Sequence, residues 1–177
     1  MTAVRPSRPR LGIAGRVLAL AILALPAAAQ DLGAKVKSAY LYHLVKFVEW
    51  PELPPDAVHL CVLGDPDIGA LLGELSGRPV KNRSLNIEVD PAGDPAGCQL
   101  LFIGSARADA RSLLERVRDA PVLTVGDQPG FAGGGGIVGF YREAGRIKLE
   151  IDPEAARRAG LRISGKLMEL ARPVVPH

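Results

Sequence analysis

Three polar residues in this sequence follow apolar runs that are typical of buried strands. Asp65 comes after "VHLCVLG", Ser105 after "CQLLFIG" and Asp127 after "PVLTVG". The carboxyl ends of parallel strands share one edge of an open sheet, and small ligands commonly bind there. The spacing therefore predicts a ligand crevice lined by Asp65, Ser105 and Asp127. The same residues are also explained as helix caps (Asp65, Ser105) and as the start of a turn (Asp127), which are common after strands.

Residue types that could support catalysis or metal binding are few and poorly spaced. His59 and Cys61 point to one face of a predicted strand, but two ligands do not make a metal site. Ser164 and Lys166 are two residues apart on a predicted helix, so their side chains do not face each other. The chain has only three histidines and no G-x-S-x-G motif for a Ser–His–Asp arrangement. We therefore expect no catalytic residue, no metal site, no cofactor and no enzymatic activity.

A run of four glycines, Gly133 to Gly136, raises the question of a phosphate-binding loop. Phosphate loops place their glycines between a strand and a helix, so that the helix N-terminus faces the anion. Here the run precedes "IVGFY", which is typical of a strand, and no G-K-[ST] follows. The pattern predicts a mobile loop or a wide turn, and it argues against a nucleotide site.

The first 29 residues have the parts of a secretory signal peptide. Four arginines accompany the apolar run Val17 to Leu25, and the small residues Ala27 to Ala29 offer a cleavage site before Gln30. The apolar run is about half as long as a membrane-spanning helix needs. We therefore expect a cleaved leader at residues 1–29, followed by one exported domain at residues 30–177.

Removal of this leader changes the charge of the protein. The whole chain carries a formal net charge of +3, but without the four leader arginines 18 basic residues face 19 acidic ones. A nearly neutral surface gives no electrostatic reason to expect nucleic acid as a partner.

Only two cysteines are present, Cys61 and Cys98, and both lie in the exported part. An oxidising compartment favours a disulfide bond between them. The alternative is a pair of buried thiols that never meet.

The remaining pattern predicts the fold class. Apolar strands alternate with helical segments up to about residue 126, which indicates a largely parallel sheet with helices on its faces. "GIVGFY" and "RIKLEI" then form a predicted antiparallel hairpin with a turn at Gly145. A helix capped by Asp152 closes the chain, with a possible break near "AGLRIS". We expect a single three-layer α/β domain, in which helices flank a mixed sheet of mostly parallel strands with a C-terminal antiparallel hairpin.

The predicted helix from Lys35 to Glu49 has an unusually wide apolar face. Tyr40, Leu44 and Phe47 belong to a stripe at helical spacing, and further apolar residues widen it. This helix either packs into the core of the domain or provides a dimer or partner face; the sequence favours neither.

Several of these stretches together resemble the YfiR family of exported bacterial proteins. They are "KSAYLYHLVKFVEWP", "LCVLGDPDIGALLGELSGRPV", "CQLLFIGSA", "PVLTVGDQPGFAGGGGIVGFYREAGRIKLEID" and "AARRAGLRISGKLMELA". The resemblance runs in order from about Lys35 to Ala171, and its first and last blocks are the most specific.

This resemblance implies a periplasmic α/β regulator, generally dimeric, rather than an enzyme. The namesake restrains an inner-membrane diguanylate cyclase by binding its periplasmic sensor domain, which lowers cyclic-di-GMP and biofilm formation. Relatives could serve other membrane proteins, including sensor kinases. Cys61 and Cys98 look like the family's paired cysteines, which supports the disulfide. The alternative function is a periplasmic small-molecule-binding module that uses the crevice at the carboxyl ends of the parallel strands.

Overall fold

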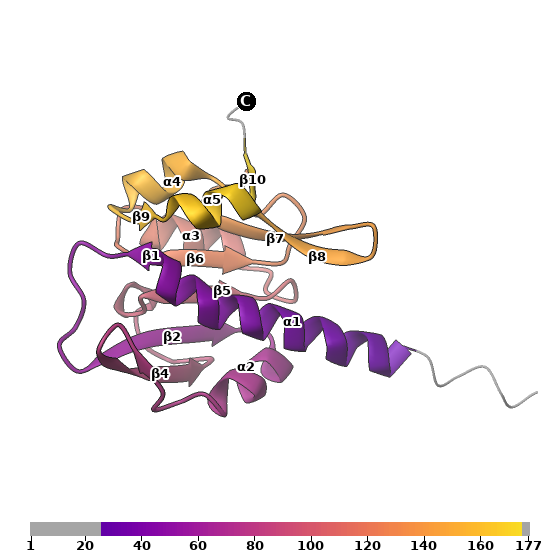
Figure 1. Ribbon diagram of the computed structural model, residues 1–177, viewed down its shortest axis with the longest axis horizontal. Coiled ribbons are helices and arrows are strands. Elements are labelled where there is room, and N and C mark those ends of the chain that lie inside the picture. The colour runs from indigo at the N-terminus through magenta and orange to yellow at the C-terminus, as the bar shows by residue number, and fades with distance from the viewer. Residues whose placement is uncertain (1–25, 175–177) are drawn as a thin grey trace, which may run out of the picture.

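The computed structural model describes residues 26–174. The predicted signal peptide lies outside the described residues, apart from its last four positions. Five α-helices occur in the described part of the chain: α1 (Pro26–Phe47), α2 (Pro66–Gly73), α3 (Ala110–Val117), α4 (Pro153–Arg158) and α5 (Gly165–Leu170). Figure 1 shows α1 lying along the sheet, between α2 on one side and α4 and α5 on the other.

Eight strands form one sheet in the order β10-β8-β7-β6-β5-β2-β4-β3. Their bounds are β2 Ala57–Leu63, β3 Pro79–Val80, β4 Arg83–Val89, β5 Leu100–Ile103, β6 Leu123–Gly126, β7 Val138–Glu143, β8 Arg146–Ile151 and β10 Arg172–Pro173. Neighbouring strands are parallel except for the β3–β4 and β7–β8 pairs. Two further short strands, β1 (Val48–Glu49) and β9 (Arg162–Ile163), pair antiparallel beside this sheet. The predicted mixed, mostly parallel sheet is confirmed.

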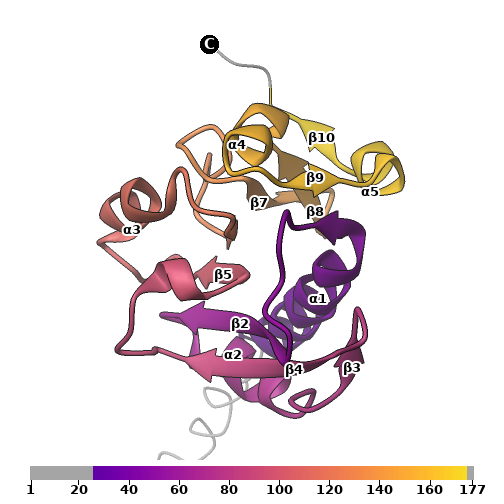
Figure 2. The same cartoon turned by 90° about the vertical axis from the view of Figure 1, so that its left-hand side faces the viewer.

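The two faces of the sheet are covered by different helices. Along β5, Leu100 and Phe102 belong to the core beneath α1 and α2, whereas Leu101 and Ile103 belong to the core beneath α3. This alternation follows from the two-residue period of a strand, which sends consecutive side chains to opposite faces. Figure 2 shows α3 on the opposite side of the strands from α1. The three-layer arrangement therefore follows from central strands, such as β5, that bury apolar side chains on both faces.

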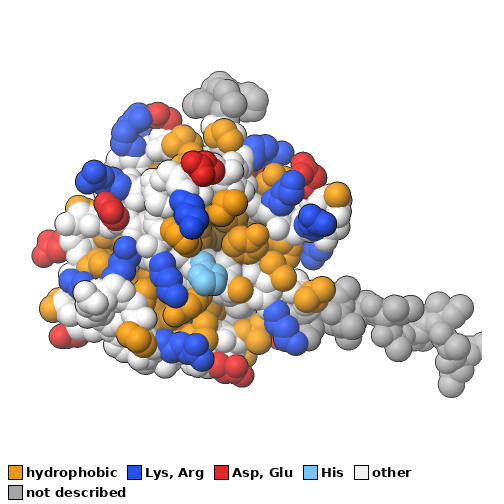
Figure 3. Space-filling view, viewed as in Figure 1, with side chains coloured by type: hydrophobic (Ala, Val, Ile, Leu, Met, Phe, Trp, Pro, Cys, Tyr) orange, Lys and Arg blue, Asp and Glu red, His pale blue; other side chains and the backbone are white. Residues whose placement is uncertain are grey.

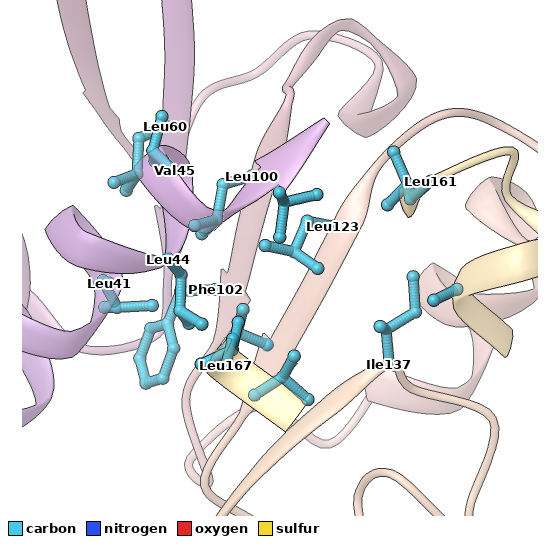
Figure 4. Packing of buried hydrophobic residues seen from close by; sticks show 14 of the residues in the cluster. Leu41, Leu44, Val45, Leu60, Leu100, Phe102, Leu123, Ile137, Leu161 and Leu167 are labelled. Carbon is cyan, nitrogen blue, oxygen red and sulfur yellow. The ribbon is translucent and has the colours of Figure 1, made fainter. Parts of the chain in front are cut away.

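Most of the wide apolar stripe on α1 is used inside the domain. Leu41, Leu44 and Val45 are at most 1% exposed and pack against strand residues such as Leu60 and Phe102 (Figure 4). Burial of each such side chain is worth about 1.5–3 kcal/mol. The core accounts for these residues, whereas Tyr40 and Phe47 are only partly buried at its margin.

The C-terminal third matches its predicted features closely. Ala144 and Gly145 join β7 to β8 with φ of 49° and 76°, the left-handed backbone that a two-residue hairpin turn requires. Asp152 caps α4 by accepting hydrogen bonds from the backbone N–H groups of Glu154 and Ala155. The helix ends before Gly160, which has a φ of 70°, and β9 separates it from α5. The predicted break is confirmed.

The prediction that a helix opens at Ser105 is wrong, because α3 begins five residues later at Ala110. The segment from Gly104 forms a turn in which the Arg107 N–H donates to the Gly104 carbonyl. The Arg107 side chain binds Asp109 and lies 3.8 Å from Asp90 beyond β4. Its hydrogen bond to Asp109 lowers the pKa of that carboxyl and occupies it, so Asp109 does not cap α3 with its side chain.

The glycine run belongs to the connection between β6 and β7, so a strand follows it as predicted. Phe131 lies inside this loop and is only 4% exposed. A Cβ atom at Gly126 or at Gly136 would overlap the Phe131 ring, so both positions need glycine for close approach. The loop is therefore held by the buried Phe131 ring.

Candidate functional site

An apolar groove of about 620 Å³ lies between α1, the β7–β8 hairpin and α5; we call it the α1–α5 groove. Tyr40, Leu44 and Phe47, the residues singled out on the first helix, all line it. Leu44 is buried at its floor, whereas Tyr40 and Phe47 are half-buried in its wall. The structure thus gathers these three residues around a single surface feature.

The other walls come from segments far away in the sequence. Ile147 and Leu149 of β8 line one side, and Leu167 and Leu170 of α5 line the other. The ring of Tyr40 lies 5.9 Å from that of Phe140 on β7, which fixes the α1 wall against the sheet. Leu170 is 74% exposed at the rim. Figure 3 shows hydrophobic side chains gathered in this region between α1 and α5.

Polar and charged side chains surround the apolar floor. His43, Arg146, Lys148 and Arg172 line the groove together with one acid, Glu169. Arg172 donates a 2.7 Å hydrogen bond to Glu150, which raises the pKa of its guanidinium, and it lies 4.1 Å from the Tyr141 ring. Lys148 pairs with Glu143, and this hydrogen bond raises the pKa of the lysine and lowers that of the glutamate. An apolar centre with a charged rim is the usual anatomy of a protein interface.

The three residues predicted to line a crevice at the strand ends have different surroundings. Asp65 caps α2 by accepting a hydrogen bond from the Ile68 N–H at 3.0 Å. Ser105 is exposed in the turn that follows β5. Asp127 instead binds Lys37 of α1. The capping explanation of Asp65 is confirmed, and Asp127 has a partner that no local pattern indicated.

A second pocket, of about 310 Å³, surrounds the Lys37–Asp127 pair; we call it the Lys37 pocket. Phe140, Tyr141, Arg142 and Ile147 of the β7–β8 hairpin and Pro129 complete its lining. Tyr141 and Ile147 also line the α1–α5 groove, so the two hollows are neighbours along α1.

Cys61 and Cys98 form the predicted disulfide, with their Cα atoms 5.9 Å apart. Both belong to the core beneath α3, on the face of the sheet that does not carry the α1–α5 groove. The bond joins β2 to the segment before β5, at the centre of the sheet.

Among the side chains that the structure describes, no group of three or more is arranged as a metal site. His59 Nδ1 lies 2.7 Å from Glu88 Oε1 on the neighbouring strand, and both side chains are about one-third exposed. In the described part of the chain, no helix has the length and apolar character needed to cross a bilayer. The described surface thus has an apolar groove beside a smaller charged pocket along α1.

The structure defines the class of protein: a three-layer α/β domain with an apolar groove along its first helix. Residues 34–172 match the YfiR/HmsC-like family, and the chain belongs to this family. No curated protein matches the chain.

Proposed function

We propose that this protein is a periplasmic regulator that binds an inner-membrane signalling protein through the α1–α5 groove and restrains it. The partner we favour is a diguanylate cyclase, so that restraint lowers cyclic-di-GMP; a sensor kinase is the alternative partner. Membership of the YfiR/HmsC-like family supports a regulatory role. The observation that carries the proposal is the apolar groove with Leu170 exposed at its rim.

The mechanism follows from linkage. A regulator that binds the inactive form of its partner more tightly than the active form shifts the partner's population toward the inactive form. A decisive shift, from 1:99 to 99:1, needs about 5.5 kcal/mol of differential binding. Contacts in the groove supply this difference if the partner presents a complementary apolar segment only in its inactive form.

The proposal is tested by deleting the gene in its host and measuring cyclic-di-GMP. We expect the deletion to raise the nucleotide level, and the wild-type gene to restore it. Leu170→Asp should fail to restore it, because a charge then enters the apolar rim. Val89→Asp is the matched control, because Val89 is an exposed apolar residue, 46% exposed, on β4 away from the groove. An unchanged nucleotide level after deletion would contradict restraint of a cyclase.

We further propose that the protein acts as a homodimer and that α1 contributes to the contact. Leu44 is unsuitable for testing this, because it is 1% exposed and its replacement by a charge would disrupt the core. Tyr40 is half-buried, so Tyr40→Glu probes association with less risk to folding. Light scattering should show a dimer for the wild type and a monomer for Tyr40→Glu; a dimeric variant would place the contact elsewhere.

A further inference from the structure

The Lys37 pocket has features that the proposed partner contact does not use. It lies between α1 and the β7–β8 hairpin, beside the carboxyl end of β6, and its volume of about 310 Å³ is at the lower end of the range for small-molecule sites. Charged groups and aromatic rings line it together. This combination favours a small ligand that has both a charged and an apolar part.

The charged wall of the pocket has unused hydrogen-bonding capacity. The side chains of Lys37 and Asp127 are 18% and 9% exposed, and they form an ion pair. Among the described residues, the Lys37 ammonium donates a hydrogen bond to Asp127 alone, although an ammonium carries three donors. The other carboxylate oxygen, Asp127 Oδ1, is buried and accepts no hydrogen bond within the same residues. The pair is therefore mutually neutralised but incompletely hydrogen-bonded.

A second cation, Arg142, gives the lining of this pocket a net positive charge. Arg142 lines it and is exposed, and its side chain has no ion-pair or hydrogen-bond partner among the residues that the structure describes. Two cations thus face one carboxylate. The planar guanidinium fork matches a carboxylate in a bidentate geometry, and such charge-assisted bonds are about twice as strong as neutral ones. The pocket therefore favours an anion.

The remaining wall is apolar. Phe140 is 5% exposed, and Tyr141 and Ile147 are half-buried. Aromatic walls favour a flat apolar ligand body, since rings stack or meet edge to face. We propose that the Lys37 pocket binds a small organic carboxylate with a ring-sized apolar body. The carboxylate binds Arg142 and the free donors of Lys37, and the apolar body lies against Tyr141 and Ile147.

The test is calorimetry on the purified protein with 2-naphthoate as the probe and uncharged 2-naphthalenemethanol as its matched comparison. We expect the wild type to bind the carboxylate at least about tenfold more tightly than the alcohol, because only the carboxylate makes charge-assisted hydrogen bonds. Arg142→Gln should remove most of this preference. Arg146→Gln is the control, because Arg146 is also exposed on the hairpin and lines the neighbouring groove instead.

Three results would overturn the proposal. Equal affinity for the two probes would show that the charged wall does not take part. A loss of affinity in Arg146→Gln but not in Arg142→Gln would move the site to the α1–α5 groove. Failure of naphthoate to bind up to its solubility limit would rule out this class of ligand. Because the experiment uses the purified protein alone, none of these outcomes depends on the proposed membrane partner.

Discussion

Lys37 on α1 and Asp127 at the carboxyl end of β6 form an ion pair across 90 residues of sequence. The pair ties the long first helix to the edge of the sheet, next to the point where the β7–β8 hairpin leaves it. The Lys37 pocket surrounds this pair, and the α1–α5 groove continues along the same helix. The position of α1 thus determines the shape of both hollows.

Replacing one member of the Lys37–Asp127 pair should destabilise the domain more than replacing both members. Lys37→Met leaves the largely buried Asp127 carboxylate without its ion-pair partner, and Asp127→Leu does the same to the Lys37 ammonium. We expect each single variant to lose up to about 3 kcal/mol of unfolding free energy, because the pair keeps some contact with solvent. The double variant should lie closer to the wild type than either single variant does.

Urea unfolding of the four proteins gives the coupling energy through a double-mutant cycle. Additive effects of the two substitutions would mean that Lys37 and Asp127 do not stabilise each other in solution.

Two glycines of the run, three residues apart in the sequence, test whether the Phe131 ring holds the loop. Gly136→Ala should destabilise the protein by about 1–3 kcal/mol, because a Cβ atom there overlaps the buried Phe131 ring. Gly133→Ala is the control: its Cβ would lie 3.7 Å from its nearest neighbours, an ordinary contact. Thermal melting should separate the two variants. Equal melting temperatures would show that the loop does not hold Phe131 as described.

The Cys61–Cys98 disulfide should raise the free energy of unfolding of the domain. Cys61 and Cys98 are 37 residues apart in sequence, for which the chain-entropy model gives roughly 3–4 kcal/mol. The variant with both cysteines replaced by serine should unfold at a lower urea concentration, and the reduced wild type should behave like it. If oxidised and reduced protein unfold at the same urea concentration, the bond does not restrict the unfolded chain in the expected way.

Local signals were sufficient to predict much of the fold. Asp65 followed by Pro66 marked the start of α2, and Asp152 followed by Pro153 marked the start of α4. Each pair supplies a side-chain cap and a fixed backbone angle at the first turn. The prediction of a helix start at Ser105 was wrong because Arg107 holds the turn that follows. The contact of Arg107 with Asp90 joins segments that are distant in sequence.

The candidate site was predictable only in part. Helical spacing singled out Tyr40 and Phe47, because a stripe that is too wide for one core contact is visible in the sequence. It did not reveal that Leu44 belongs to the core, nor that Leu170 lies opposite on α5. No local pattern indicated the Lys37–Asp127 pair, since the packing of α1 along the sheet brings the two residues together.

The most direct test of the central claim is photo-crosslinking in the native host. A photoreactive amino acid replaces Leu170 in one strain and Val89 in another, and the products are identified by mass spectrometry. We predict that position 170 crosslinks to an inner-membrane protein with a periplasmic segment and a signalling domain, and that position 89 does not. If the two positions give the same products, or if position 170 captures no membrane protein, the α1–α5 groove is not the surface through which this protein acts.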